Sequence, residues 1–457
     1  MDINHLFESF AHAITFWVVF PVLISLGIFL SIKLKFPQLT KISYGFRSIL
    51  KDDGKGQGNI THFEAIATVL AGNLGTGNIS GMAVALGTGG PGALIWMWVM
   101  AFFGAILQYS GCLLGGFYRK QNDQGEFLGG PMYYIEKGMK KKSLAILFSV
   151  FSLLTAFSCG NFVQVNSLSL PLQEIGWNPF LISLIVAAAV GYVIIGGGHR
   201  VALIASKVVP FMATLYLLVA FLILGYNLDK VLPAFSLLFR SAFDFSSIFG
   251  GAMGFGMARA LSTGFERGIF ATDAGTGIAP ILQANAKAKS PVMEGIIAMV
   301  APFIVLIICT LTGLVLIVTG AFEVPGLKST LMCTYAFEKG VGHEMGAYVV
   351  VISLILFAYT TILAWAFCGE KAVEYLFDRK KISFFRWLYV GLIPIGVFAK
   401  VDLVWHLADI TMAGMLLTNL SALAYLSPLI IRESEKYFGS KEFLEIDHLD
   451  ETEQETA

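Results

Sequence analysis

Charged side chains are scarce in this sequence. They account for 14% of its 457 residues, whereas 56% are hydrophobic, and the mean hydropathy is +0.73. Water-soluble domains carry about 25% charged residues, so a soluble globular protein is excluded and an integral membrane protein is predicted. Basic and acidic residues balance at 31 each, and with no net positive charge a nucleic-acid partner is not expected.

Residues that build metal centres and enzyme active sites are also sparse. The five cysteines are scattered without CxxC spacing, so neither a disulfide framework nor a metal centre is indicated. His406 has no histidine, cysteine or carboxylate at ligand spacing, and no Ser-His-Asp arrangement stands out. We therefore expect no enzyme activity and no cofactor, and the sequence indicates no protein partner.

Long apolar segments, in contrast, are abundant. A transmembrane helix needs about 20 consecutive apolar residues, and eleven segments come near that length. They lie at 13–33, 61–87, 92–118, 143–170, 179–196, 201–226, 247–262, 291–320, 347–369, 387–399 and 404–431. The fold class predicted is therefore an all-α integral membrane protein with about eleven transmembrane helices, embedded in a lipid bilayer.

Lysine and arginine are distributed unevenly between alternate loops. Short cytoplasmic loops carry the excess of basic residues. With the N-terminus outside and the C-terminus cytoplasmic, 26 of the 31 basic residues fall inside, including Arg259, Arg267, Lys287 and Lys289 after the seventh segment. The sequence thus predicts a multi-pass protein of the cell inner (plasma) membrane in this orientation.

The ten segments after the first divide into two sets of five that begin with opposite orientation. Secondary transporters are built from such inverted repeats. We expect a leading helix and cytoplasmic loop at 1–60, a first five-helix repeat at 61–226, an inverted second repeat at 247–431 and an acidic cytoplasmic tail at 432–457.

The second apolar segment is interrupted at its centre by the run Asn73 to Asn78. Unwound backbone in hydrocarbon leaves unpaired groups that cost several kcal/mol each, so it survives only where it lines a cavity or holds a ligand. Helix packing alone would explain Gly77, but not the polar side chains of Asn73, Thr76 and Asn78. The ends of the two half-helices can hold a zwitterion beside Na⁺.

Repeat symmetry predicts a second interrupted segment at the start of the second repeat. Gly250, Gly251 and Ala252 stand there, within an apolar run. Gly275 to Gly277 is a rival, because it repeats the Gly-Thr-Gly of the first interruption. Charged residues flank this rival on both sides, which favours a cytoplasmic loop or an interfacial helix.

Paired hydroxyls and a tryptophan occupy the ninth segment. Thr360 and Thr361 lie at its centre, where hydroxyls either bond the carbonyl one turn back or supply hard oxygen ligands for Na⁺. Trp365 lies one turn further on, as a cap for a pocket or as an interface anchor.

The fourth segment carries a polar cluster of Asn161, Gln164, Asn166 and Ser167. Three of these, spaced at i, i+3, share one helix face. An intramembrane polar face points toward the protein interior, where it binds a substrate or joins helices by hydrogen bonds.

With these features the chain resembles the alanine or glycine:cation symporter family, the sodium:alanine symporters, over about residues 64–437. The motifs that carry the resemblance are Gly75-Thr76-Gly77-Asn78-Ile79, Gly89-Gly90-Pro91-Gly92-Ala93, Trp96-Met97-Trp98, Gly129-Gly130-Pro131-Met132-Tyr133-Tyr134-Ile135, Gly160-Asn161 with Val163-Gln164 and Asn166, Arg267-Gly268 with Ala274-Gly275 and Ala279-Pro280, and 357–363. The family usually carries Asn-Glu where this chain has Thr272-Asp273.

The resemblance implies a leucine-transporter-type fold, a 5+5 inverted repeat preceded by one extra helix, and Na⁺-coupled uptake of alanine or glycine. It places the substrate carboxylate at the amides of Thr76 and Gly77, and the substrate amine at the carbonyls of Gly250 and Gly251. It also places Na⁺ between two groups of oxygens. These are the carbonyls of Ala71 and Leu74 and the hydroxyls of Thr360 and Thr361.

Two alternatives share this fold. A proton-coupled amino-acid carrier needs a titratable group in the membrane core, and Glu64 or Asp273 would have to lie there. The simpler interpretation places acidic residues and a histidine near span ends, with solvated or snorkelled side chains: Glu64, Asp402, His406 and Asp409. A non-transporting channel or sensor would keep the fold and lose counterflow.

Overall fold

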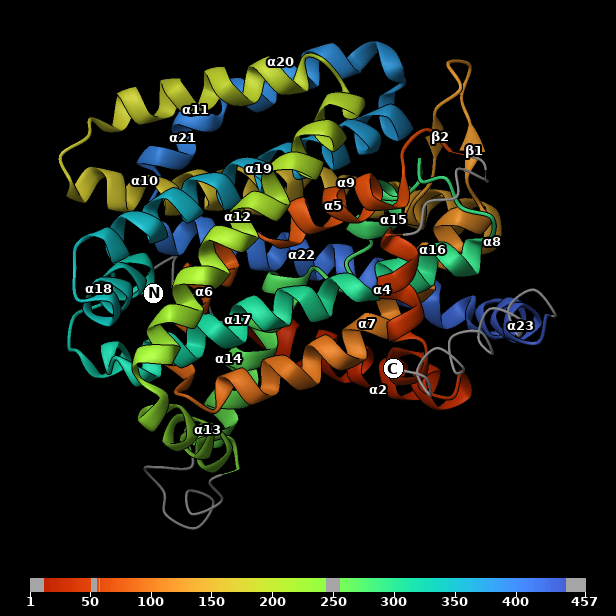
Figure 1. Cartoon of the computed structure of the whole chain (residues 1–457). Coiled ribbons are helices and arrows are strands. Elements are labelled where there is room, and N and C mark those ends of the chain that lie inside the picture. The colour runs from red at the N-terminus through yellow and green to blue at the C-terminus, as the bar shows by residue number, and fades with distance from the viewer. Residues whose placement is uncertain (1–11, 51–55, 57, 244–254, 441–457) are drawn as a thin grey trace.

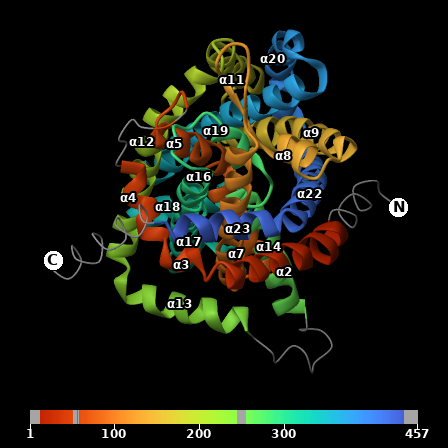
Figure 2. The same cartoon turned by 90° about the vertical axis from the view of Figure 1, so that its right-hand side faces the viewer.

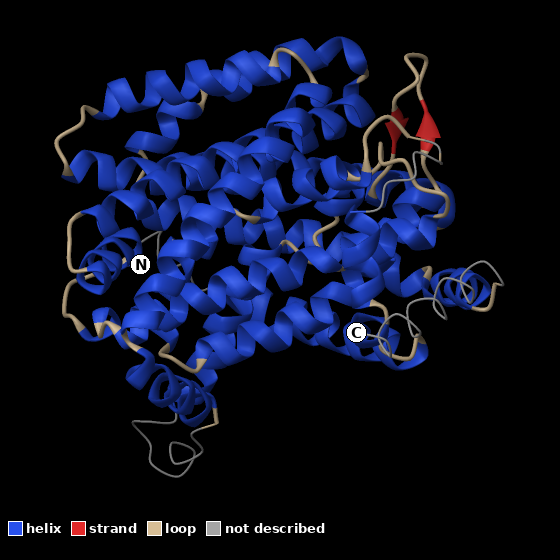
Figure 3. Cartoon of the chain, viewed as in Figure 1, coloured by secondary structure: helices blue, strands red, loops and turns tan. Residues whose placement is uncertain are grey.

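The computed structural model describes residues 12–50, 56, 58–243 and 255–440. Most of the described residues are helical, and the strands among them form one short hairpin (Figure 3). The first part contains η1 (Thr15–Val19), α2 (Phe20–Lys33), α3 (Pro37–Thr40), α4 (Ile42–Leu50), α5 (His62–Asn73), η2 (Thr76–Asn78), α6 (Ser80–Gly89), α7 (Ala93–Phe117), β1 (Lys120–Gln121), β2 (Phe127–Leu128), α8 (Pro131–Gly138), α9 (Lys142–Phe157), η3 (Ser158–Val163), α10 (Gln164–Glu174), α11 (Pro179–Ile194), α12 (Gly198–Tyr226) and α13 (Leu228–Ala242).

The second part begins at Phe255. It contains α14 (Phe255–Thr272), α15 (Ile278–Leu282), α16 (Pro291–Ala298), α17 (Val300–Val318), η5 (Ala321–Glu323), α18 (Ser329–Val341), α19 (Met345–Phe377), η6 (Arg379–Lys381), α20 (Ile382–Gly391), α21 (Ile393–Phe398), α22 (Val401–Tyr425) and α23 (Ser427–Phe438). The strands β1 and β2 are antiparallel, with Lys120 opposite Leu128.

The long helices run side by side across the molecule, with α11 and α20 along one edge (Figure 1). The hairpin, α8 and α23 lie at one end of this bundle, which we call the hairpin end, and α18 lies at the other, which we call the α18 end. Figure 2 looks along the bundle from the hairpin end, and α7, α16 and α17 are surrounded there by the other helices. Most buried apolar side chains of the described residues form one continuous core, and Ile60, Ala65, Ala202 and Ala286 form a small second cluster.

Eight helical stretches of the described chain are long and apolar enough to cross a membrane, and α11 is a shorter apolar helix. Large apolar side chains on their outer faces are exposed, for example Phe211, Leu218 and Phe221 of α12. Lipid satisfies such surfaces, and helices satisfy their own backbone groups in hydrocarbon. The predicted all-α integral membrane fold is confirmed. The count of eleven spans, the inverted repeat and the domain bounds stay predictions.

Helix α5 begins where the sequence supplies a capping box. The Thr61 hydroxyl accepts the Glu64 N–H, and the Glu64 carboxylate accepts the Thr61 N–H at 2.8 Å. Such a reciprocal pair satisfies donors that a helix start leaves free. Glu64 therefore caps the N-terminus of α5, in line with the simpler interpretation that placed it near the end of a span.

The predicted interruption of the second apolar segment is confirmed. Helix α5 ends at Asn73, a short 3₁₀ turn covers Thr76–Asn78, and α6 starts at Ser80. Residues 65–83 are all buried, so the unwound backbone faces protein and not lipid, which is the condition for its survival in a membrane.

The expectation for Gly275–Gly277 is wrong. These residues lie in a buried turn between α14 and α15 and not in a cytoplasmic loop or interfacial helix. The seventh segment was also drawn too short, since α14 continues to Thr272. Arg259 and Arg267 consequently lie within α14, before this turn, whereas Lys287 lies after α15. The two arginines and Lys287 therefore do not belong to one loop. The predicted interruption at residues 250–252 lies outside the described residues.

Candidate functional site

Two interrupted helices meet inside the bundle. The side-chain amide of Asn73, at the end of α5, donates to the Thr272 carbonyl at the end of α14 at 2.8 Å. Gly77 of the first interruption lies against Phe270, because a Cβ on Gly77 would come within 2.6 Å of that ring. The first interruption (73–79) and the second (273–277) therefore form one buried region, which we call the double break.

Within the first interruption, one side chain replaces missing helix hydrogen bonds. The Asn78 amide donates to the carbonyls of Asn73 and Gly75, at 2.7 and 3.3 Å. Its Oδ1 accepts the Cys309 thiol from α17 at 3.2 Å. Asn78 thus holds the unwound backbone in shape, and the direct substrate contact expected for it stays a prediction.

Helix α19 brings a hydroxyl to the exposed carbonyls of this interruption. Thr361 donates to the carbonyls of Ala71 at 2.8 Å and Leu74 at 3.3 Å, and its side chain is buried. These are three of the four oxygen-bearing residues expected around Na⁺, and hard oxygen ligands suit that ion. The donor set fits a small monovalent cation.

The fourth expected ligand points elsewhere. The Thr360 hydroxyl donates to the carbonyls of Leu356 and Phe357 in its own helix, both at 3.1 Å, and touches the sulfur of Met212. This is the back-bonding usual for threonine in helices. The structure therefore brings Thr361, but not Thr360, to the first interruption.

Gln164 reaches the interruption from α10. Its Oε1 accepts the Thr76 N–H at 3.0 Å and the Thr76 hydroxyl at 3.1 Å, and its Nε2 donates to the Cys159 carbonyl. A Cβ on Gly75 would stand 2.9 Å from Gln164 Oε1 and 3.0 Å from Thr361 Oγ1. Glycine at position 75 is therefore required for the close approach of both side chains. The Thr76 N–H donates to an acceptor oxygen in this structure.

Trp365 lies one turn beyond Thr361 and is fully buried. A Cβ on Gly160 would come within 2.2 Å of the Trp365 Cβ, so the indole rests on the π-helical turn η3. Its Nε1–H finds no hydrogen-bond acceptor among the described residues. A buried donor of this kind is costly to leave unpaired, and a contact between the indole and a substrate stays a prediction.

Asn166 does not reach the double break. Its amide donates to the carbonyls of Gly396 and Ala399 at 3.1 and 3.0 Å, so it fastens α10 to the end of α21. Asn161 similarly donates to the Tyr389 carbonyl. Of the polar cluster on the fourth segment, Gln164 contacts the double break and the two asparagines make interhelical hydrogen bonds. A substrate contact of Asn166 stays a prediction.

The second interruption contains a buried carboxylate that the sequence interpretation did not include in the site. Asp273 is 3% exposed, has a left-handed backbone (φ +48°), and its Oδ1 finds no hydrogen-bond partner in the part of the chain that the structure describes. The repeated Gly-Thr-Gly at 275–277 was the signal that could have identified it.

An ion pair adjoins the double break through two aromatic rings. Arg267 of α14 binds Asp409 of α22 at 3.0 Å, and its guanidinium stacks on Trp405 with 4.9 Å to the ring centroid. Phe270 packs on Trp405 in turn, with ring centroids 4.7 Å apart. Asp409 is thus paired inside the bundle, and its solvated span-end interpretation is wrong.

Known proteins similar to this chain are transporters. The family model for the sodium:alanine symporter family matches residues 1–449. An uncharacterized transporter of Haemophilus influenzae is 40% identical over 95% of this chain and 96% of its own length. The sodium/alanine symporter AgcS of Methanococcus maripaludis is 38% identical over 91% and 93%. The probable sodium/glutamine symporter GlnT of Bacillus subtilis is 33% identical over 92% and 87%.

A solved structure supports the fold. MhsT in complex with L-phenylalanine aligns with a TM-score of 0.60 at 13% identity, over 83% of this chain and 93% of MhsT. The protein is therefore a multi-pass membrane transporter and not an enzyme, with the leucine-transporter-type fold. The family model matches nearly the whole chain, and the spans and the double break agree with this match. The chain belongs to the sodium:alanine symporter family.

Proposed function

We propose that this protein is a Na⁺-coupled symporter that carries a small neutral amino acid, alanine or glycine, into the cell by alternating access. The observation that supports it most directly is the Thr361 hydroxyl on the carbonyls of Ala71 and Leu74. With Na⁺ bound, the hydroxyl oxygen and both carbonyls would turn to the ion, which would then join α19 to the first interruption.

The double break offers a zwitterionic amino acid one hydrogen-bond donor for its carboxylate and one carboxylate for its ammonium group. The Thr76 N–H already binds an acceptor oxygen, that of Gln164, and a substrate carboxylate would take that place. The Asp273 carboxylate, with Oδ1 unpartnered among the described residues, would pair with the substrate ammonium, since a buried charge needs an opposite one. Gly250, Gly251 and Ala252 stay a prediction, because they lie outside the described residues.

The close packing of the double break favours a small substrate. Gly75 leaves no room for even one added carbon beside Gln164, and Gly77 leaves none beside Phe270. The fully buried Trp365 closes a third side. A methyl group or a hydrogen is the side chain most easily accommodated, whereas a glutamine side chain needs these groups to move.

The test is uptake by purified protein in proteoliposomes. Alanine and glycine uptake should require an inward Na⁺ gradient, and glutamine should compete poorly. Trans-stimulated exchange of labelled alanine separates a carrier from a channel or sensor, which would show no counterflow. Uptake that is unchanged when K⁺ replaces Na⁺ would overturn the coupling claim.

Proton coupling is the second candidate, and Asp273 is the observation that favours it. A proton-coupled carrier needs a titratable group in the core, and Asp273 lies there while Glu64 caps a helix end. The putative sodium/proton-dependent alanine carrier YrbD of Bacillus subtilis is 33% identical. Uptake driven by a pH gradient without Na⁺ would select this candidate.

A further inference from the structure

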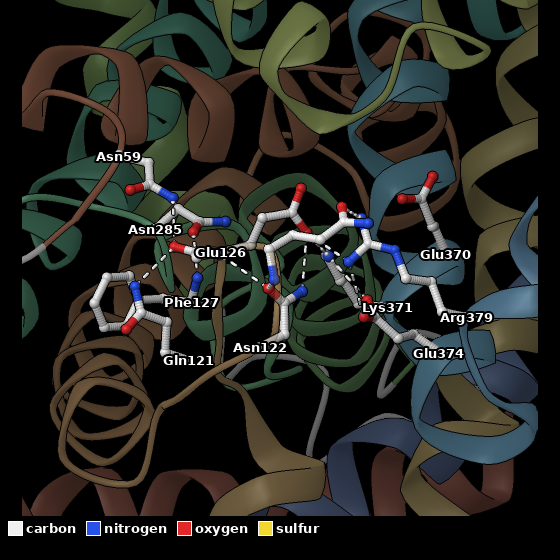
Figure 4. A network of polar contacts seen from close by, with 12 residues as sticks. Asn59, Gln121, Asn122, Glu126, Phe127, Asn285, Glu370, Lys371, Glu374 and Arg379 are labelled. Atoms are coloured by element: carbon white, nitrogen blue, oxygen red, sulfur yellow. Dashed lines mark hydrogen bonds and ion pairs between the residues drawn. The ribbon is translucent and has the colours of Figure 1, made fainter.

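The hairpin end of the molecule carries a charged network that the transport site does not use (Figure 4). Its centre is Glu126, in the loop between β1 and β2. Glu126 Oε2 lies 3.4 Å from Lys371 Nζ of α19 and 3.6 Å from Arg379 of η6. Lys371 also binds Glu374 at 2.9 Å, and Arg379 donates to Gln124. The contacts between hairpin and α19 are thus made by side chains and are mainly ionic.

The same hairpin is tied firmly to both interrupted helices. Asn285, in the loop after α15, accepts the Phe127 N–H on its side chain at 2.7 Å. Asn59, before α5, donates to the Gly125 carbonyl at 3.0 Å. Backbone bonds join the two loops directly, from Asn59 N–H to the Asn285 carbonyl at 2.8 Å and from Lys287 N–H to the Ile60 carbonyl at 2.9 Å.

The chain after the hairpin leads straight to the second interruption. Leu128 is followed by α8, whose Pro131 would lie 2.4 Å from a Cβ on Gly277. Tyr134 of α8 donates to Asn419 of α22, which donates in turn to the Gly275 carbonyl at 2.8 Å. The hairpin, the start of α5 and the end of α15 therefore belong to one connected unit.

We infer that the hairpin, residues 120–128, is a latch that holds this unit against α19 and must release when the double break opens toward the hairpin end. The inference rests on the proposed alternating access, because only a site that opens alternately needs a reversible closure. The Glu126 and Arg379 side chains are 39% and 41% exposed, so water competes for their ionic contacts and these can break on every cycle.

The electrostatics of Glu126 agree with a closed latch. Partial burial raises the pKa of this carboxyl, but Lys371 and Arg379 outweigh burial and the pKa lies below its ordinary value. The carboxylate is therefore charged at neutral pH. Lys371 is 6% exposed and keeps Glu374 as a second partner, so loss of Glu126 would loosen the latch without leaving a buried cation unpaired.

Native cysteines supply a direct readout of opening. Cys368 lies on α19 between Trp365 and Lys371 and is fully buried here. Cys333 lies on α18 at the opposite end and is buried as well. If the latch controls access from the hairpin end, its weakening should expose Cys368 to a small polar thiol reagent and leave Cys333 protected.

The first experiment compares Glu126→Gln with the native protein in detergent, quantifying modification of each cysteine by peptide mass spectrometry. We expect Cys368 to react about fivefold faster in the variant, the effect of about 1 kcal/mol on an opening equilibrium. Glu433→Gln is the matched control, because it breaks an ion pair with Arg432 on α23 that does not touch α19. Equal Cys368 rates in native and Glu126→Gln protein would overturn the latch.

The second experiment locks the latch. Gln124→Cys and Arg379→Cys place two thiols where the native side chains meet, and a short reversible bis-methanethiosulfonate joins them. The locked protein should lose alanine uptake and counterflow, keep Na⁺-dependent alanine binding, and recover on reduction. Uptake at the native rate by fully crosslinked protein would contradict the proposal. The Cys368 measurement uses no substrate, so it tests the latch even if the coupling ion or amino acid proves different.

Discussion

At the scale of single residues, adjacent threonines with the same chemistry have different surroundings. Thr361 reaches across to the carbonyls of Ala71 and Leu74, whereas Thr360 bonds its own helix. Successive residues on a helix point about 100° apart, so a hydroxyl pair in sequence need not be a pair in space. The sequence predicted which helix brings a hydroxyl to the first interruption, but not which of the two hydroxyls does so.

Thr361→Val should weaken activation by Na⁺. Valine keeps the shape and removes an oxygen ligand, so we expect the Na⁺ concentration for half-maximal uptake to rise about tenfold, or ~1.4 kcal/mol. Thr360→Val is the matched control and should stay within about twofold, since its hydroxyl bonds its own helix and the sulfur of Met212 but none of the carbonyls of the first interruption. Na⁺ titration of alanine uptake measures both, and an equal shift in the two variants would remove Thr361 from the ion site.

Asp273→Asn should weaken alanine binding. Asparagine tolerates the left-handed backbone at this position, so folding is preserved while the charge is lost. A hydrogen bond to a charged group contributes about 1.5–3 kcal/mol, which predicts a rise of about 10- to 100-fold in the alanine dissociation constant. Equilibrium binding at saturating Na⁺ measures it.

The outcome also separates the two coupling candidates. If Asp273→Asn binds alanine with native affinity, Asp273 is not the ammonium partner. If the variant additionally loses stimulation of uptake by a pH gradient while exchange continues, Asp273 is the proton site.

At the scale of elements, one interruption was predictable and the other was not. The first stands out because polar residues and glycines break an apolar segment. The second was not predicted, because charged residues next to it suggested a solvent-exposed loop. Arg267 and Asp273 suggested a loop, yet Arg267 is neutralised by Asp409, far along the chain in α22, and Asp273 is buried. Pairing between distant helices leaves no local pattern, which is also why the latch could not be anticipated.

The π-helical turn η3 is an element whose geometry depends on one glycine. Gly160→Ala would bring a methyl group within 2.2 Å of the Trp365 Cβ, and such overpacking costs about 1–3 kcal/mol. We expect a lower unfolding temperature in detergent and weaker alanine binding. Gly225→Ala, in α12, is the matched control, because nothing lies within 4 Å of the added carbon. A native unfolding temperature for Gly160→Ala would show that the turn can shift freely.

At the scale of the whole molecule, orientation in the membrane links the latch to the direction of transport. Two of the 26 basic residues that the sequence assigned to the cytoplasmic side, Arg259 and Arg267, lie in α14, before the second interruption. The remaining 24 still outnumber those outside, and the basic segment Lys140 to Lys142 lies at the hairpin end beside α8. The positive-inside rule therefore predicts that the hairpin end is cytoplasmic, in which case the latch would close the side from which substrate leaves.

Single cysteines at the two ends test this orientation. Asp123, in the hairpin loop, and Glu344, before α19, are both exposed, and the five native cysteines are buried, so background labelling should be low. An impermeant maleimide on intact cells should label Glu344→Cys and spare Asp123→Cys, and permeabilised cells should label both. The reverse pattern would place the hairpin outside, and the latch would then close the entry to the site and not its exit.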